Sequence, residues 1–481
     1  MHKLLKFFII AWFIVILAYR LMISFSYRPE LTNGESNNIW KAINVAAGKK
    51  IYNDPEKLPI EVFQYNPLSE LPIIGFSKLF NPQSQYYLYN ITVAGRLFQL
   101  FCTLVLAYFI YKIGIKLLEI SKKSSLMASL AAITMLTPTA FTIRPDATVL
   151  IFLFSSIYAF GLFIKSNSKK WIILASILII LSFLTKQDGI FIAFPFGLYL
   201  LMNKKWKTFL FFSLSILFFL ITTLFSLHLF FGEFYWINTL KGLKNTMSIH
   251  QMIAVFDRSN SFFGFYLIIG LILSIYNLLR GYKLLQLLSI INLFYLFISL
   301  GISTKIGSWV NYYTPNVIIT VMLIFGTVFS NNYKKSREFQ IITCVYIILS
   351  AFIYLTLQAY NYTLPFIKNY KNQYISSYKE YQYLANKFPI SKNEFIFTPT
   401  PLLRNFYALN NCMVNTEYYN QASYRYEHFK NNTKTKLKYI IFEKDEISLV
   451  NNIVSFFSIN LKNYEIEEHN SYLIYKLKTL K

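Results

Sequence analysis

The chain has 481 residues, of which 55% are hydrophobic, 19% aromatic and only 14% charged. Soluble globular proteins have about 45–50% apolar and about 25% charged residues, so this composition excludes an ordinary soluble enzyme and favours an integral membrane protein. A net charge of +25 would suggest nucleic-acid binding in a soluble domain. In a membrane protein, lysine and arginine concentrate in cytoplasmic loops instead, so we expect no nucleic-acid partner.

Apolar runs of about 18 or more residues are candidate membrane helices, and the chain contains about eleven runs of this kind. The first is interpreted as a retained anchor, because no small-residue cleavage site follows it. The fifth and sixth runs are short and could together form one broken hairpin. The eleven runs span roughly 4–24, 93–115, 125–141, 147–164, 171–184, 189–202, 208–231, 262–279, 284–300, 311–329 and 338–357.

The short loops that follow the even-numbered runs are basic, for example Lys122-Lys123 and Lys204-Lys205. By the positive-inside rule these loops are cytoplasmic. The N-terminus is then inside the cell and the C-terminus outside. This predicts an all-α polytopic membrane domain over 1–359, with a first external loop at 25–91.

The tail, 360–481, has charges of both signs and short alternating runs, which predict a small extracytoplasmic α/β domain. It contains one cysteine, Cys412, and no Cys-x-x-Cys pair, so a disulfide within the tail and a zinc knuckle are excluded. The expected helices lie at 376–387 and 447–457, and the expected strands at 394–397, 437–442, 464–467 and 472–477.

Polar residues gather at the predicted external ends of the apolar runs. In the first loop, Glu35 precedes Ile39, Trp40 and Ile43, which share one face at helical spacing and predict a short helix lying in the membrane interface. Glu35 either complements the start of that helix or has a catalytic role. For the stretches that contain Asp54 and Tyr65, taken by themselves, turns are the favoured interpretation.

Three later connections also carry charge, and each has a structural alternative. Asp146 could cap a helix beside an interfacial Arg144, and Lys186 could extend to the headgroups. The segment from Lys305 could form an aromatic belt. Together, however, these residues place acids and cations on one membrane face, where a carboxylate can serve as general base and cations can stabilise a departing phosphate. The segments are Arg144-Pro145-Asp146, Thr185-Lys186-Gln187 and Lys305 to Asn311-Tyr312.

The order of these segments resembles the GT-C superfamily of polytopic glycosyltransferases, in particular the bacterial branch related to protein O-mannosyltransferases and lipid A aminoarabinose transferases. The resemblance rests on an acid in the first loop, a Gly-x-x-x-Tyr-x-Asp stretch at 48–54, Tyr-Asn-Pro-Leu at 65–68, and the three charged segments. It covers roughly 4–357.

The resemblance implies an inverting hexosyl- or pentosyltransferase in the bacterial cytoplasmic membrane. Its donor would be a sugar on a polyprenyl phosphate, and its acceptor a hydroxyl of a glycan, lipid or protein that enters from outside. The implied catalytic residues are Glu35 and Asp146. The implied substrate-binding residues are Asp54, Tyr65, Arg144, Lys186, Gln187, Lys305, Asn311 and Tyr312.

Two questions stay open at this level. Many relatives carry two adjacent acids in the first loop, whereas Asn33-Gly34 precede a single Glu35 here. We therefore expect no cofactor and no metal, although a divalent ion is possible, and Glu30, Asp54 and Glu61 compete for the role of base. The alternative functions are a transporter or flippase of lipid-linked sugars and an O-antigen-type polymerase or ligase.

Overall fold

A computed structural model describes the chain over residues 2–28, 31, 34–54, 63–240, 242, 246–330, 336–360, 370–391, 394–398, 400, 403, 405, 407, 437–444 and 459–478. Its contacts divide the chain into two compact units. The first comprises Met1–Phe25, Arg96–Phe225 and Met247–Phe366, and the second comprises Ser26–Gly95, Ser226–Thr246 and Ile367–Lys481. The predicted boundary after residue 359 separates a membrane domain from an extracytoplasmic domain. This boundary stays a prediction, because the two units are defined by contacts and not by their position in a membrane.

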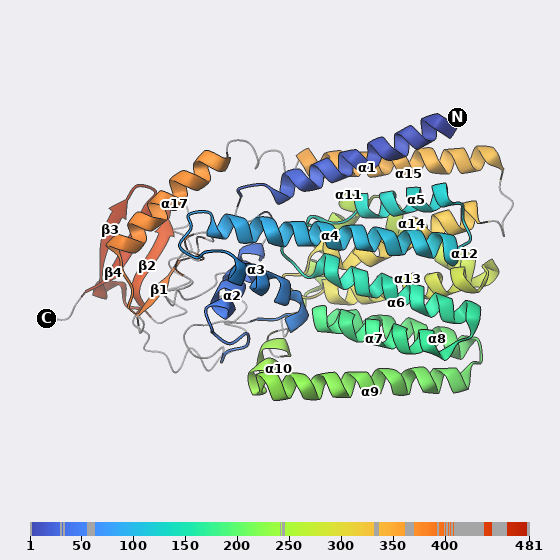
Figure 1. Ribbon diagram of the computed structural model, residues 1–481, viewed down its shortest axis with the longest axis horizontal. Coiled ribbons are helices and arrows are strands. Elements are labelled where there is room, and N and C mark those ends of the chain that lie inside the picture. Colours follow the sequence, from blue (N-terminus) through green and yellow to red (C-terminus); the bar gives the residue numbers. More distant parts are fainter. Residues whose placement is uncertain are drawn as a thin grey trace. The chain divides into compact units, whose positions relative to one another are not determined.

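The first unit is built from long apolar helices (Figure 1). Within the described residues, seven helices are long and apolar enough to cross a membrane, and α11 with α12 forms an eighth candidate that is bent by 90°. The predicted polytopic helical architecture is therefore confirmed, whereas eleven spans and their orientation stay predictions. The helices are α1 His2–Ser24, α4 Tyr87–Lys116, α5 Lys122–Thr134, α6 Asp146–Ser166, α7 Lys169–Thr185, α8 Ala193–Met202, α9 Trp206–Phe231, α11 Ile249–Phe263, α12 Tyr266–Arg280, α13 Lys283–Ser303, α14 Thr314–Phe329 and α15 Arg337–Gln358.

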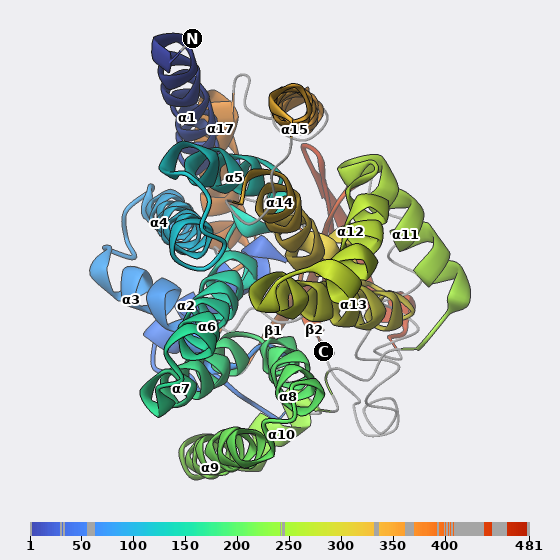
Figure 2. The same cartoon turned by 90° about the vertical axis from the view of Figure 1, so that its right-hand side faces the viewer.

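Two helix groups position the residues discussed below. Helices α6 and α7 form an antiparallel hairpin, and α12, α13 and α14 pack against one another, as the end-on view in Figure 2 shows. A Cβ on Gly270 of α12 would lie 2.1 Å from Thr320 Oγ1 of α14, so glycine permits this close approach. Asn316 donates to the Asn292 carbonyl at 2.8 Å, which links α14 to α13.

The third apolar run is not one helix. Helix α5 ends at Thr134, and a short 3-10 turn, η2, occupies Pro138–Ala140. Pro138 has no amide hydrogen to donate and disfavours helical backbone in the residue before it. The segment 135–143 is buried, and irregular backbone at membrane depth is tolerated where protein surrounds it.

The second unit contains a small mixed sheet with strand order β1-β2-β4-β3, in which only the β1–β2 pair is parallel among the described strands. The predicted tail helix and four strands are confirmed, and the predicted helix 447–457 lies outside the described residues. The elements are α2 Glu35–Ala46, η1 Pro67–Ser69, α3 Leu71–Leu79, α10 Glu233–Thr239, α17 Tyr370–Lys387, β1 Phe395–Phe397, β2 Leu437–Glu443, β3 Tyr464–His469 and β4 Tyr472–Leu477.

The first-loop helix, α2, is present where the periodicity predicts it, but it is not an interfacial helix. Every residue of Glu35–Asn44 is buried, including Lys41, which is 2% exposed. An interfacial helix keeps its polar face in water, whereas the polar face of α2 is packed inside the protein. The prediction failed because the spacing of the apolar residues identifies one buried face of the helix. It does not indicate whether protein or water contacts the polar face.

Candidate active site

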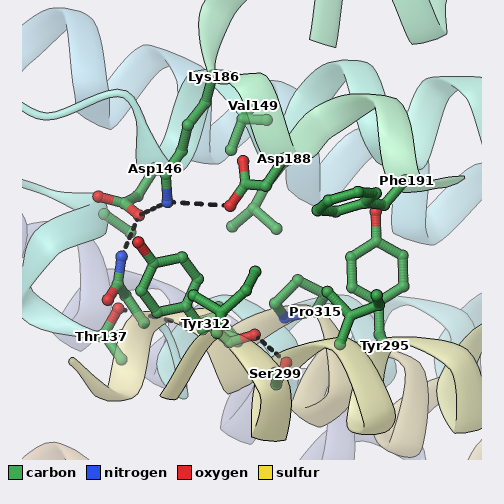
Figure 3. A pocket seen from close by; sticks show the side chains of 16 residues that line it. Thr137, Asp146, Val149, Lys186, Asp188, Phe191, Tyr295, Ser299, Tyr312 and Pro315 are labelled. Carbon is green, nitrogen blue, oxygen red and sulfur yellow. Dashed lines mark hydrogen bonds and ion pairs between the residues drawn. The ribbon is translucent and has the colours of Figure 1, made fainter. Parts of the chain in front are cut away.

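A pocket in the first unit lies where several helices begin or end (Figure 3). Its wall contains the turn η2, the start of α6, the 3-10 segment η3 Gln187–Ile192, and the last three turns of α13. The 3-10 segment η5 Val310–Tyr313, which leads into α14, completes it. Helix ends leave backbone groups unsatisfied and bring polar side chains together, so this position suits a polar site inside an apolar protein.

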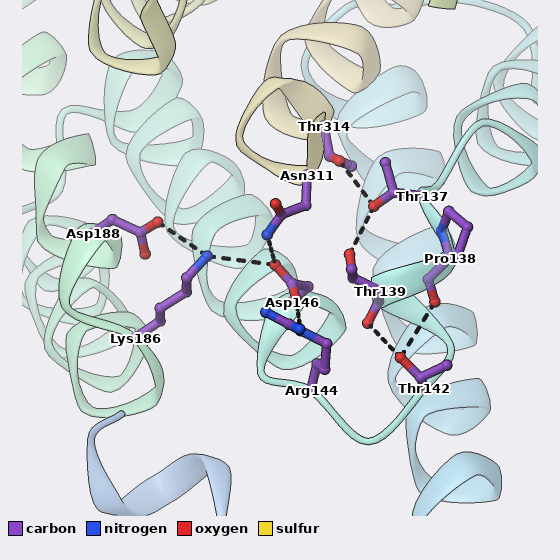
Figure 4. Close-up of polar contacts among 10 residues, drawn as sticks. All are labelled: Thr137, Pro138, Thr139, Thr142, Arg144, Asp146, Lys186, Asp188, Asn311 and Thr314. Atoms are coloured by element: carbon purple, nitrogen blue, oxygen red, sulfur yellow. Dashed lines mark hydrogen bonds and ion pairs between the residues drawn. The ribbon is translucent and has the colours of Figure 1, made fainter. Parts of the chain in front are cut away.

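Asp146 is the centre of the polar contacts in this pocket (Figure 4). It is the first residue of α6, where the helix dipole favours a negative charge. Asn311 Nδ2 donates to its Oδ1 at 2.6 Å, and Lys186 Nζ lies 3.4 Å from the same oxygen. Arg144 Nε lies 3.6 Å from Oδ2. Two donors therefore hydrogen-bond to Oδ1, and the Arg144 guanidinium forms an ion pair with Oδ2.

Lys186 is held inside the pocket by two carboxylates. It follows α7 directly, in an extended conformation, and is 8% exposed. Its Nζ lies 3.3 Å from Asp188 Oδ2 and 4.5 Å from the centre of the Tyr312 ring. A buried ammonium is costly unless anions compensate it. The side chain therefore does not extend to the headgroups, which was the structural alternative for this lysine.

Asp188 joins this cluster, although our reading of the sequence did not place it in the site. A Cβ on the next residue, Gly189, would lie 2.4 Å from Ser182 Oγ and 2.5 Å from the Ser182 carbonyl carbon. Only glycine therefore lets η3 turn back against the end of α7. That turn puts Asp188 beside Lys186. The sequence feature that could have indicated this pair is an acid two residues after a lysine.

Tyr312 is fixed through its backbone. Ser299 Oγ donates to the Tyr312 carbonyl at 2.7 Å and lies 3.3 Å from Asn316 Oδ1. Thr314, at the start of α14, lies 3.4 Å from Thr137 through their hydroxyls. These contacts hold the η5 segment, and with it Asn311, against η2 and α13.

Three predicted residues of the first unit do not line the pocket, and Arg144 is one of them, since it contacts the cluster only through Asp146. Gln187 is the first residue of η3 and is not among the lining residues. Lys305 follows α13 and forms a backbone bridge with Met247. The five predicted residues that the structure brings together are Arg144, Asp146, Lys186, Asn311 and Tyr312.

The predicted first-loop residues lie in the second unit. Glu35 is fully buried, and its Oε2 accepts a hydrogen bond from the Leu31 amide at 3.0 Å. Gly34, which precedes it, has a φ of 92°, a conformation that side chains other than glycine rarely adopt. The Tyr65 carbonyl accepts from Tyr52 at 2.8 Å, and Asp54 is half-buried. A joint role for Glu35 and Asp146 stays a prediction, and the competing bases Glu30 and Glu61 lie outside the described residues.

A second carboxyl in this unit, Glu70, is also buried, at 1% exposure. Burial raises its pKa to about 8, although the nearby Lys41 ammonium opposes this shift. Glu70 is the only charged residue between residues 63 and 77. An acid in such an apolar stretch is a signal that our sequence reading did not use.

No group of three or more His, Cys, Asp or Glu side chains within the described part of the chain is arranged to hold a metal ion. The pocket instead offers the Lys186 ammonium, and the Arg144 guanidinium lies beside Asp146, which lines the pocket. These groups bind phosphate oxygens directly, the ammonium as a point charge and the guanidinium through a planar fork. The chemistry that the described residues support is therefore anion binding by side chains.

A wide apolar groove, with a volume of about 700 Å³, lies in the same unit between α8, α9 and α13. Pocket and groove share a wall, because adjacent residues divide between them. Ile190 lines the groove and Phe191 the pocket, and on α13 Phe294 lines the groove and Tyr295 the pocket. The polar pocket therefore has an apolar groove beside it.

Comparisons with known proteins agree with this architecture. The family described as dolichyl-phosphate-mannose-protein mannosyltransferase matches residues 88–236. The chain is similar to ArnT from Cupriavidus metallidurans in the apo state, with 11% identity, and bound to undecaprenyl phosphate, with 10% identity; each match has a TM-score of 0.57 and covers 97% of both chains. An Archaeoglobus fulgidus oligosaccharyltransferase matches with 13% identity and a TM-score of 0.49, over 97% of this chain and 74% of that chain. No curated protein matches the sequence.

At these identities the likeness to ArnT establishes a shared fold. The resemblance to polytopic GT-C glycosyltransferases that the order of motifs predicted is confirmed.

Proposed function

We propose that this chain is an integral-membrane glycosyltransferase that moves a sugar from a polyprenyl phosphate to an acceptor hydroxyl on the extracytoplasmic face. The observation that carries the proposal is the buried cluster of Lys186, Asp146, Arg144 and Asn311 at the ends of membrane helices. Charges at such a depth are expensive and usually mark a substrate path. The crystal structure of ArnT bound to undecaprenyl phosphate, which has the same fold, supports the choice of donor.

The apolar groove is the proposed location of the polyprenyl tail. Its lining is almost entirely aliphatic and aromatic, and it adjoins the pocket across η3 and α13. Ligand sites commonly combine an apolar surface with a few polar groups that fix orientation. In this arrangement the tail occupies the groove and the phosphate lies near Lys186.

In the proposed reaction, the acceptor oxygen attacks the anomeric carbon of the donor sugar. The bond from that carbon to the phosphate oxygen breaks, and the polyprenyl phosphate leaves with the bonding electrons. Glu35 accepts the proton of the acceptor hydroxyl as general base. Lys186 and Arg144 stabilise the charge on the leaving phosphate.

Asp146 has a different part in this scheme. Its oxygens are already engaged by Lys186, Arg144 and Asn311. We propose that it holds the two cations where the phosphate binds. This is the positioning that makes electrostatic stabilisation effective, because the donors need not reorganise during the reaction.

The direct test measures lipid-linked sugars by mass spectrometry in membranes from cells with the wild-type protein, with Glu35→Gln and with none. A polyprenyl-phosphate sugar should accumulate in both defective strains, while one glycan loses that sugar. Equal donor pools and equal glycans in all three strains would refute the transferase and favour a transporter. We also expect chelators to leave transfer unchanged, as measured with purified protein before and after treatment with EDTA.

A further inference from the structure

The pocket is lined by two polar atoms that take no part in the contacts among Lys186, Asp146, Arg144 and Asn311. These are Asp188 Oδ1 and the Tyr295 hydroxyl. Both are buried, and neither has a hydrogen-bond partner among the residues that the structure describes. Leaving such groups unsatisfied is costly, so an unpaired donor and acceptor that line one pocket indicate a bound polar molecule.

The two residues occupy a defined place relative to the cations. Asp188 contacts Lys186 through its other oxygen, Oδ2, at 3.3 Å. Tyr295 is 6% exposed and lies eight residues before Ser303, the end of α13, which corresponds to about 12 Å along the helix. Figure 3 shows Phe191 and Tyr295 at the end of the pocket opposite Asp146, with Asp188 between.

The chemistry of this end of the pocket suits a sugar ring. A carboxylate oxygen accepts hydrogen bonds from hydroxyls, and a tyrosine hydroxyl both donates and accepts. The Phe191 and Tyr312 rings add aromatic surface to the same lining. A phosphate dianion has no hydrogen to donate to Asp188 Oδ1, whereas the hydroxyls of a polyol satisfy both unpaired groups.

We propose that Asp188 and Tyr295 recognise the sugar of the donor, with Asp188 Oδ1 accepting a hydrogen bond from one sugar hydroxyl and Tyr295 hydrogen-bonding to another. This inference rests on the proposed function, because it assumes that the phosphate of the donor binds at Lys186. Asp188 thereby has two contacts, since Oδ2 orients Lys186 and Oδ1 binds a hydroxyl of the sugar.

The test compares two ligands in the purified full chain. These are undecaprenyl phosphate and undecaprenyl-phosphoryl hexoses, and binding is measured for the wild type, Tyr295→Phe and Asp188→Asn. We expect the affinity for the best hexose lipid to fall about threefold to tenfold in Tyr295→Phe and more in Asp188→Asn. The affinity for bare undecaprenyl phosphate should be unchanged in Tyr295→Phe. Tyr199→Phe is the matched control, because Tyr199 is also buried but does not line the pocket.

The possible outcomes distinguish a failure of the sugar-recognition pair from a failure of the proposed function. If every variant keeps the wild-type ratio between hexose lipid and bare lipid, the sugar-recognition pair is refuted while the proposed function stands. If the wild type binds neither lipid, the proposed function fails and this inference with it. If a variant does not fold, deoxy-hexose lipids test the same contacts in the wild-type protein, and unchanged affinity for every deoxy donor would refute the pair.

Discussion

Lys186 Nζ lies 3.4 Å from Asp146 Oδ1, although 40 residues separate the two in the chain. The helix hairpin explains this contact, because α6 begins at Asp146 and the antiparallel α7 ends immediately before Lys186. The first residue of one helix therefore meets the residue that follows the other. The hairpin brings one acid and one cation together at the same depth, and the following predictions depend on that arrangement.

Replacing Lys186 by alanine should weaken donor use by about tenfold to a hundredfold, because the change removes a charge-assisted contact to the phosphate. The measurement is transfer rate against donor concentration in proteoliposomes. Lys170→Ala is the matched control, since Lys170 lies exposed at the opposite end of α7. An unchanged donor dependence in Lys186→Ala would show that this lysine only balances Asp146 and Asp188.

Replacing Glu35 by glutamine should reduce transfer by about a hundredfold to ten-thousandfold, which is the usual contribution of a general base. The amount of protein inserted in the membrane should not change. Glu233→Gln serves as control, because Glu233 is exposed and starts α10 after Gly232, much as Glu35 starts α2 after Gly34. Full activity in Glu35→Gln would show that Glu35 is not the general base, and Asp54, Glu30 and Glu61 would be tested next.

Glu70 should make the protein less stable as the pH rises. Its pKa is about 8 in the folded protein and 4.5 without burial, so between these values the folded state binds more protons than the unfolded state. Stability is then lost from about pH 4.5 to about pH 8, by an amount on the order of a few kcal/mol. Melting curves in detergent between pH 5 and pH 9 measure the effect.

The groups that influence Glu70 are the Lys41 ammonium, which opposes the shift, and Tyr52, which is uncharged over this range. Glu70→Gln should flatten the pH dependence of the melting temperature, whereas Glu233→Gln should leave the slope intact. Parallel curves for the wild type and Glu70→Gln would show that the carboxyl does not hold its proton in the folded state.

Replacing Gly189 by alanine should lower transfer and stability together. The new Cβ would lie 2.5 Å from the Ser182 carbonyl carbon, so η3 must move away from α7 and carry Asp188 from Lys186. Gly75→Ala is the control, since its Cβ would meet nothing within 4 Å and alanine is the better helix former. Wild-type activity and melting temperature in Gly189→Ala would contradict the close packing of η3 on α7.

Several features of the fold could be predicted because they depend on local sequence. Helix α1, the long helices from α4 to α15 and the strands of the tail follow from apolar runs and alternation. Asp146 and Lys186 stood out because a charge between apolar helices is costly wherever the chain places it. The break at Pro138 was missed, although proline carries the signal, because the apolar composition continues through it.

The class of the protein, its helices, and the segments in which charge meets the membrane could be predicted from the order of the amino acids. These follow from composition and from periodicity over neighbouring residues. Tertiary structure alone decided which charges pair. It joins Lys186 to Asp146 and Asp188, leaves Lys305 outside the pocket wall, and buries Glu70 and Lys41. Such pairing depends on contacts between residues far apart in the chain and on the fit of a glycine such as Gly189, which no local pattern encodes.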